Sequence, residues 1–158
     1  MTTYLNGVII TKKPNILPMI LLDGATTGFL NSGKIEMVKL SKDATAPRVM
    51  SSISLSDYNP NNSLKVRAYL SHEITGETLD LDLDYIAIKT DENYNTKSAG
   101  TTLTNTPTSP GVSYQKFTTV FEIPNTSFDE NTSLTIYFKS TSSGLTGDLY
   151  LWGIDIYQ

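Results

Sequence analysis

The chain has 158 residues, of which 39% are hydrophobic and 18% charged, with a formal net charge of −4 and no cysteine. This length fits one domain with its own hydrophobic core, and the lack of cysteine excludes disulfide bonds and thiolate metal sites. Because the net charge is negative and the basic residues are scattered along the chain, nucleic acid is not expected as a partner. The composition is rich in Thr, Ser and Asn, which favour strands and turns over helices.

The first 23 residues differ from the rest of the chain. Pro14 and Pro18 disfavour a regular helix or a central strand. The apolar runs around them predict an extended arm that packs on its own domain or against a neighbouring subunit. The residues expected to make this contact are Val8, Ile9, Ile10, Ile16, Leu17, Met19, Ile20, Leu21 and Leu22. The apolar stretch at residues 16–22 is too short to span a membrane, so no membrane insertion is expected. The arm also has no signal-peptide cleavage pattern.

The remaining residues, 24–158, alternate between apolar and polar side chains with a period of two. This pattern is typical of half-buried strands. In the clearest case, Leu64, Val66, Ala68 and Leu70 alternate with Lys65, Arg67, Tyr69 and Ser71. Further strands are expected near 35–39, 51–56, 79–88, 117–123, 134–139 and 148–157, separated by turn-forming clusters such as 57–62.

Two places interrupt the alternation. The apolar parity changes near Tyr85 and Ile86, and again at Gly153. A bulge or a change of sheet would explain each change. Residues 91–111 are polar and contain Gly and Pro, so they are expected to form one or two exposed loops.

Seven to nine short strands with no helical stripe predict an all-β fold. Two antiparallel sheets packed face to face are the simplest solution, and a jelly roll is the preferred version. The expected organisation is an N-terminal docking arm (1–23) followed by a β-sandwich domain (24–158).

Catalytic groups are scarce. His72 is the one histidine, and it is expected at the surface near a turn. The row Asp80, Asp82 and Asp84 is interpreted as a solvated strand face, with a calcium site as the alternative. We therefore expect no catalytic residues, no metal and no cofactor, and a protein that acts by binding or assembly.

Several aromatic side chains are candidates for contact with a ligand. Tyr69 and Tyr137 fall on the polar side of their strands and should point away from the core, while Tyr94 and Tyr114 flank the long polar stretch. They are interpreted as sheet decoration or, alternatively, as rings on which sugars stack. Trp152 lies beside the predicted bulge and is expected to be structural.

The end of the chain carries a resemblance. The run from Thr146 to Tyr157, TGDLYLWGIDIY, resembles the closing strand of a group of bacteriophage structural proteins, in which a strand like residues 134–139 commonly precedes it. Residues 53–59, followed by residues 64–66, are similar to the unit "strand, Asp-Tyr, turn, strand" in the same group. The likeness covers residues 49–158.

The resemblance implies a jelly-roll module on a bacteriophage virion, assembled in the host cytoplasm. Capsid decoration, head fibre, tail fibre and baseplate component are the expected roles. The implied partners are copies of the chain itself, with a homotrimer favoured, and other virion proteins. The alternative is a carbohydrate-binding or adhesin module that recognises host surface glycans.

Overall fold

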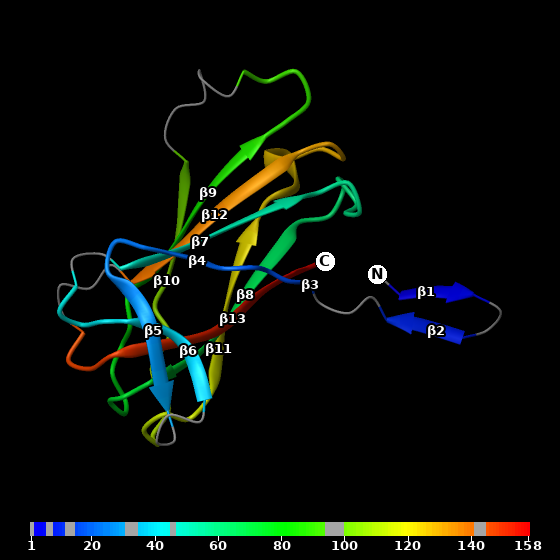
Figure 1. Ribbon diagram of the computed structural model, residues 1–158. Coiled ribbons are helices and arrows are strands. Elements are labelled where there is room, and N and C mark those ends of the chain that lie inside the picture. Colours follow the sequence, from blue (N-terminus) through cyan, green and yellow to red (C-terminus); the bar gives the residue numbers. More distant parts are fainter. Residues whose placement is uncertain are drawn as a thin grey trace.

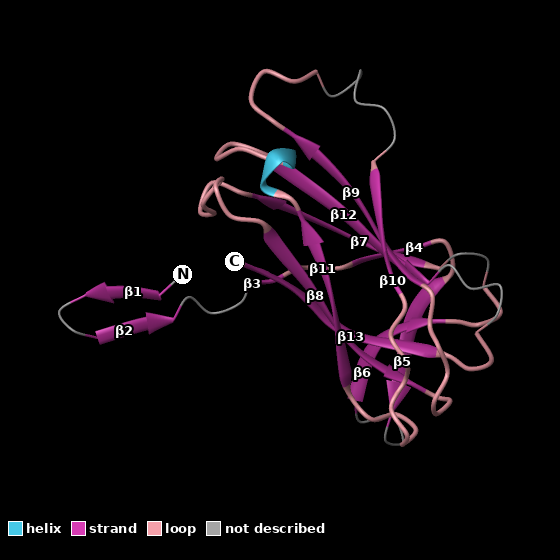
Figure 2. Ribbon diagram, turned by 180° about the vertical axis from the view of Figure 1, so that it is seen from behind, coloured by secondary structure: helices cyan, strands magenta, loops and turns pink. Residues whose placement is uncertain are grey.

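A computed structural model of the protein describes residues 2–5, 8–11, 15–30, 35–44, 47–93, 100–140 and 145–158 (Figure 1). Within these ranges the chain forms thirteen strands and a short 3-10 turn, η2 (Asn125–Ser127). Figure 2 shows strands throughout the body of the molecule, with η2 as a helical turn near one end. In the described part of the chain, no helix has the length and hydropathy needed to cross a membrane.

Eleven of these strands build two antiparallel sheets. Ten follow the two strand orders below, and β3 (Asn15–Ile16) joins the second sheet by pairing with β13. The first, called here the β9 sheet, has the order β10-β9-β12-β7-β4. Its strands are β4 (Ile20–Leu22), β7 (Arg48–Ser54), β9 (Leu81–Ile88), β10 (Thr101–Asn105) and β12 (Ser133–Ser140). The second, called the β8 sheet, has the order β11-β8-β13-β6-β5. Its strands are β5 (Ala25–Leu30), β6 (Ile35–Leu40), β8 (Leu64–His72), β11 (Phe117–Ile123) and β13 (Leu149–Tyr157).

The core lies between the two sheets and follows from the period-two alternation. Leu64, Val66, Ala68 and Leu70 of β8 are at most 1% exposed, as predicted. They belong to the same apolar cluster as Leu134, Ile136 and Phe138 of β12. Each such Leu or Ile side chain removed from water contributes about 1.5–3 kcal/mol. The predicted antiparallel β-sandwich of the jelly-roll type is confirmed.

The bulge predicted at Gly153 is present. The pairing of β13 with β8 shifts between Leu151 and Gly153, so Trp152 is the extra residue. The bulge predicted near Tyr85 and Ile86 is wrong, because the register of β9 with β12 runs through both residues without a shift. Tyr85 and Ala87 continue the alternating row of buried residues that begins with Leu81 and Leu83. Ile86 lies on the opposite face of the strand and is half-buried.

Residues 91–111 are not simply loops. Strand β10 lies within this stretch and pairs with β9 at the edge of the sheet. The sequence pattern did not predict β10 because Leu103 is its one large apolar residue, and that side chain is only half-buried. An edge strand with solvent on one side needs little apolar alternation, and hydrogen bonds to its neighbour then define it.

The N-terminal arm divides into two parts. Strands β1 (Thr2–Leu5) and β2 (Val8–Thr11) pair with each other as a two-stranded sheet of their own. By contrast, β3 (Asn15–Ile16) pairs with β13 and β4 pairs with β7, so the later half of the arm is part of the sandwich. Leu17, between them, is 4% exposed and belongs to the core cluster.

Candidate functional site

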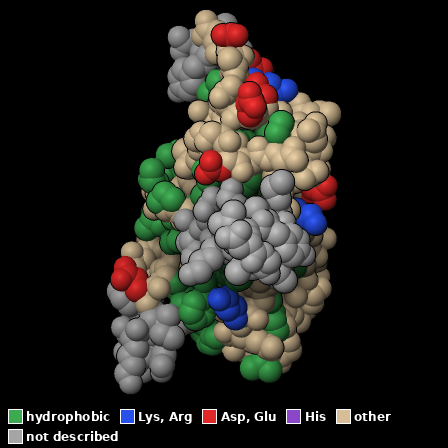
Figure 3. All heavy atoms as spheres, turned by 90° about the vertical axis from the view of Figure 1, so that its right-hand side faces the viewer, with side chains coloured by type: hydrophobic (Ala, Val, Ile, Leu, Met, Phe, Trp, Pro, Cys, Tyr) green, Lys and Arg blue, Asp and Glu red, His purple; other side chains and the backbone are tan. Residues whose placement is uncertain are grey.

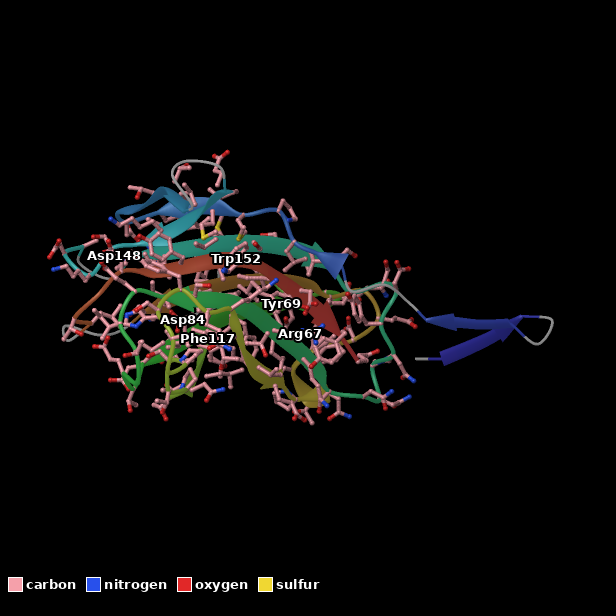
Figure 4. The ribbon with its side chains drawn as sticks, turned by 90° about the horizontal axis from the view of Figure 1, so that it is seen from below. Arg67, Tyr69, Asp84, Phe117, Asp148 and Trp152 are labelled. Atoms are coloured by element: carbon pink, nitrogen blue, oxygen red, sulfur yellow. The ribbon has the colours of Figure 1, made fainter. Side chains whose placement is uncertain are left out.

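One surface of the sandwich gathers aromatic and basic side chains. This surface is the outer face of the β8 sheet, opposite to the core. Because Val66, Ala68 and Leu70 point inward, Arg67 and Tyr69 point outward. The register with β13 places Asp155 opposite Arg67 and Gly153 opposite Tyr69. Figure 4 shows Trp152, Tyr69 and Arg67 following one another along these strands.

The bulge in β13 decides what reaches this face. Leu151 and Ile154 are both buried in the core, so the two residues between them, Trp152 and Gly153, are left to the outer side. The indole Nε1 of Trp152 donates a hydrogen bond of 2.8 Å to the hydroxyl oxygen of Ser71, which fixes the plane of the ring. A side chain at Gly153 would meet no atom within 4 Å. Open space therefore lies directly opposite the Tyr69 side chain.

Tyr114 is held beside this row by a strained backbone. It has a φ angle of +61°, a conformation that bulky residues rarely adopt. Its amide donates a hydrogen bond of 2.8 Å to the carbonyl oxygen of His72, and its ring centroid lies 5.9 Å from that of Tyr150. The side chain is 41% exposed. Backbone strain of this kind concentrates at functional sites, so the position of Tyr114 points to a role beyond packing.

Two cations lie over the rings. The Nζ atom of Lys116 is 4.7 Å from the centroid of the Tyr69 ring and 5.3 Å from that of the Trp152 ring. The guanidinium carbon of Arg67 is 5.1 Å from the Tyr69 centroid and 4.8 Å from the centroid of the Tyr157 ring. Cations in this range are attracted by the electron density of the ring faces.

A buried carboxylate anchors Arg67 and Tyr69. The Asp155 side chain is 1% exposed. It accepts hydrogen bonds from Arg67 Nε at 3.2 Å and Nη2 at 2.8 Å, and from the Tyr69 hydroxyl at 2.8 Å. The bond to Asp155 raises the pKa of Arg67, and burial followed by the same carboxylate raises the pKa of Tyr69. Both groups therefore keep their protons and a fixed orientation at neutral pH.

A second ion pair lies at the other end of the face, beside Tyr150. Lys39 Nζ lies 2.6 Å from Asp148 Oδ2, and Lys39 is the pairing partner of Tyr150. Burial raises the pKa of Asp148, but hydrogen bonds from Lys39 and from the Lys42 amide outweigh it, and the pKa lies below its usual value. Each end of the face thus contains a carboxylate, Asp155 or Asp148, that is already paired with a basic side chain.

His72 is buried, so its predicted surface position is wrong. The ring Nδ1 lies 2.8 Å from the Ile74 carbonyl oxygen, and Nε2 lies 3.1 Å from the Gly147 carbonyl oxygen and 3.3 Å from Glu77 Oε2. These contacts join two loops beneath Tyr114, whose amide binds the His72 carbonyl. The imidazole is a structural connector between the loops.

The four predicted ligand-facing tyrosines do not form one group. Tyr69 and Tyr114 both belong to the face described above. Tyr137 points outward from the β9 sheet instead, with the Arg48 guanidinium carbon 5.3 Å from its ring centroid. Tyr94 lies outside the described residues.

Four exposed or half-buried residues of the face are absent from the predicted ligand-facing set. They are Arg67, Lys116, Trp152 and Tyr157, whereas Tyr150 is buried at 8% exposure. The sequence signal for Trp152 was present, because the bulge predicted at Gly153 also turns the tryptophan outward. Lys116 gave no signal, since its position over two rings depends on the pairing of β11 with β8.

The aspartate row is an ion-paired strand face. Asp84 accepts hydrogen bonds from Lys139 Nζ at 2.7 Å and from Thr102 Oγ1 at 2.6 Å. Asp82 is 8% exposed and accepts a hydrogen bond of 2.7 Å from Thr104 Oγ1. The prediction of a solvated face is therefore wrong for Asp82, because β10 covers it. Among the described residues, no group of three or more His, Asp or Glu side chains could hold a metal ion.

No protein-family model and no curated protein matches the sequence. Among solved structures, the family 30 carbohydrate-binding module of cellulosomal cellulase Cel9D-Cel44B from Clostridium thermocellum is similar at 13% identity. The match covers 93% of this chain and 95% of that chain, with a TM-score of 0.52. The K3 cleaved adhesin domain of Lys-gingipain from Porphyromonas gingivalis is similar at 9% identity, over 91% and 95% of the two chains, also with a TM-score of 0.52.

A phage protein is also among the similar structures. The enzymatically active domain of tailspike protein 4 from bacteriophage CBA120 matches at 14% identity, over 89% of this chain but 18% of that chain, with a TM-score of 0.47. This score is too low to establish a shared fold. The matches to the cellulase module and the adhesin domain establish that the chain adopts a jelly-roll β-sandwich fold that carbohydrate-binding modules also adopt.

Proposed function

We propose that this protein is a carbohydrate-binding module that holds a glycan against the outer face of the β8 sheet, without catalysis. The observation that carries the proposal is the row of rings on that face, formed by Tyr114, Trp152, Tyr69 and Tyr157, with the buried ring of Tyr150 packed beside Tyr114. A pyranose ring presents C–H bonds on its flat faces, and these pack favourably against the negative face of an aromatic ring. A row of rings suits a chain of sugars.

The rings are accompanied by polar groups in fixed positions. Asp155 orients the Tyr69 hydroxyl and the Arg67 guanidinium, and Ser71 orients the indole of Trp152. Groups held in this way lose little side-chain entropy when a ligand arrives. The fold shared with a carbohydrate-binding module and an adhesin domain supports the same proposal.

Replacing Tyr114 by Ala tests the proposal directly. Loss of a ring on which a nucleobase stacks weakens binding by about 1–3 kcal/mol. We expect a loss of the same order for a stacked sugar, so the affinity for a bound glycan should fall by about tenfold or more. Binding is measured by affinity electrophoresis and calorimetry against a broad panel of polysaccharides. The control is Tyr137→Ala, which removes the same side chain from the outer face of the β9 sheet and should leave the affinity unchanged.

A second variant covers the case in which Tyr114→Ala disturbs its loop. Gly153→Val fills the open space opposite Tyr69 from a strand position with no atom within 4 Å, and it should also weaken binding. Failure of every polysaccharide to bind the wild-type protein would reject the proposed function. Equal losses in Tyr114→Ala and Tyr137→Ala would reject the site.

A second candidate function is an exterior assembly module of a bacteriophage virion, which docks and self-associates as a trimer. Two features favour it. Strands β1 and β2 pair only with each other among the described strands. On the edge strand β4, Ile20 is 53% exposed and Leu21 is 37% exposed. Figure 3 shows that hydrophobic side chains reach the surface in several places on one side of the molecule, among separate acidic and basic groups. The two candidates are compatible, since a fibre module can also bind host glycans.

Light scattering distinguishes the candidates. The full chain is compared with a variant that lacks residues 1–11, a cut that removes β1 and β2 but keeps β3 and β4 in the sandwich. A trimer that becomes a monomer after truncation supports assembly through the N-terminal hairpin. A monomer in both forms rejects it and leaves a free-standing binding module. The double substitution of Ile20 and Leu21 by Ser separately tests the β4 edge.

A further inference from the structure

The outer face of the β8 sheet, called here the ring-bearing face, carries several basic side chains. Some of them are paired with a carboxylate and others are not. Arg67 is neutralised by Asp155 through two hydrogen bonds, and Lys39 is neutralised by Asp148. Lys116 differs from both. Its ammonium group contacts the Tyr69 and Trp152 rings, and no carboxylate of the described residues lies within 4.0 Å of it. Lys65 at the end of β8, opposite Tyr157, is also exposed, and among the described residues it forms no ion pair and its ammonium group lies over no ring. Lys116 is therefore the unpaired cation of this face that lies over the rings.

The position of Lys116 also decides which sugars fit. Its Nζ atom lies over the two rings on which a sugar would stack. A neutral sugar has to displace the ammonium group from the rings, and it offers that group hydroxyl acceptors but no opposite charge. A sugar that carries a carboxylate can occupy the same place and pair with the displaced ammonium group through a charge-assisted hydrogen bond. The competition therefore favours an anionic ligand.

The acidic groups nearby do not oppose such a ligand at this end of the face. Asp155 is buried and accepts three hydrogen bonds from Arg67 and Tyr69. Asp148 pairs with Lys39 at the opposite end, where Glu73 also lies and binds the Asp148 amide at 3.0 Å. Glu122 is exposed at the far end of the face, where it is the pairing partner of Lys65. The other carboxylates of the face, Asp148 and Glu73, thus lie near Tyr114, and the ammonium group of Lys116 lies over Tyr69 and Trp152.

On the basis of the proposed function, we propose that the ligand is an acidic glycan, and that Lys116 binds the carboxylate of a sugar stacked on Tyr69 and Trp152. Lys116 is then the residue that determines specificity, and the rings supply affinity that does not depend on charge. The expected ligand class is a polysaccharide that contains uronic or sialic acid residues.

The test compares acidic polysaccharides with neutral forms of the same chains. The probes are polygalacturonate, alginate, hyaluronan and polysialic acid, each paired with its carboxyl-reduced or methyl-esterified form, together with neutral xylan, galactan and cellulose oligosaccharides. The wild-type protein is expected to bind at least one acidic chain at least tenfold more tightly than its neutral form. The preference should shrink as salt is added, because the pair is exposed.

Two variants locate the effect. Lys116→Met keeps the length of the side chain but removes the charge, and it should reduce binding of the acidic chain by about tenfold while leaving the neutral form unchanged or slightly tighter. Lys89→Met is the control: it removes the same charge from a residue that follows β9 and bonds to the Thr126 carbonyl oxygen. It should change neither affinity. Lys116 is exposed, and the Lys89 hydrogen bond lies at the surface, so both variants are expected to fold, and their thermal transitions verify this.

The outcomes separate the inference from the proposed function. Binding of neutral glycans that depends on Tyr114, with no preference for acidic chains, overturns the inference and leaves the proposed function intact. An acidic preference that survives in Lys116→Met also overturns it. Absence of binding to any probe overturns both. Loss of the acidic preference in Lys116→Met, but not in Lys89→Met, supports it.

Discussion

Replacing Asp155 by Ala removes the anchor of the ring-bearing face. The side chain is 1% exposed and accepts three hydrogen bonds, two from Arg67 and one from the Tyr69 hydroxyl. Hydrogen bonds to a charged group each contribute about 1.5–3 kcal/mol. Arg67 is 28% exposed, so water recovers part of the loss from that side. The free energy of unfolding is therefore expected to fall by about 2–4 kcal/mol, at the lower end of the range for breaking a buried pair.

Urea denaturation followed by tryptophan fluorescence measures this change. Trp152 lies on the same strand, so its emission reports unfolding of the site itself. The variant Asp155→Asn keeps the shape and part of the hydrogen bonding, and it should lose less stability than Asp155→Ala. A double-mutant cycle with Arg67→Met isolates the ion pair from the rest of the change. A loss below about 0.5 kcal/mol in Asp155→Ala, the range of ordinary surface substitutions, would refute the assignment of Asp155 as the anchor.

Two further predictions concern the backbone and the pH dependence. Gly100→Ala places a Cβ atom 2.5 Å from a carbonyl oxygen of β9 and should lower the free energy of unfolding by about 1–3 kcal/mol. In Gly153→Ala the new Cβ meets no atom within 4 Å apart from its chain neighbours, so stability should not fall. Equal melting temperatures for the two variants would contradict this reasoning. Although burial raises the pKa of Asp84 and Asp148, hydrogen bonds from their lysine partners lower it below the usual value. The unfolded chain then binds more protons below about pH 4, so the contribution is full above that pH and is lost as the pH falls further. Urea midpoints measured from pH 7 to pH 3 test this, and Asp84→Asn should flatten the curve; a midpoint that does not fall on acidification would be inconsistent with it.

The strands with regular alternation could be predicted because their burial is regular. In β8, β11 and β12, one face packs on the core and the other faces solvent, so a period of two appears directly in the residues. Gly153 could be placed at a bulge for the same reason, since Leu151 and Ile154 cannot both reach the core without an extra residue between them.

The strands and residues that were missed depend on partners far away in the chain. β10 is a strand because β9 offers it hydrogen bonds, while its own side chains are mostly exposed. His72 is buried because the loops at Ile74 and Gly147 close over it. Polar side chains become buried when the fold supplies their hydrogen-bond partners, and such partners have no signature in the local sequence.

The sequence by itself determined the all-β class, the apolar face of each regular strand and the presence of tyrosines that point away from the core. The tertiary structure alone decided which of these rings come together. Tyr69, Tyr114 and Trp152 are separated by tens of residues, and pairing of β8 with β11 on one side and β13 on the other brings them onto one face. Pairing of β12 with β7 and β9 places Tyr137 in the opposite sheet. Strand order is a long-range property of the chain, so the site is formed by the fold.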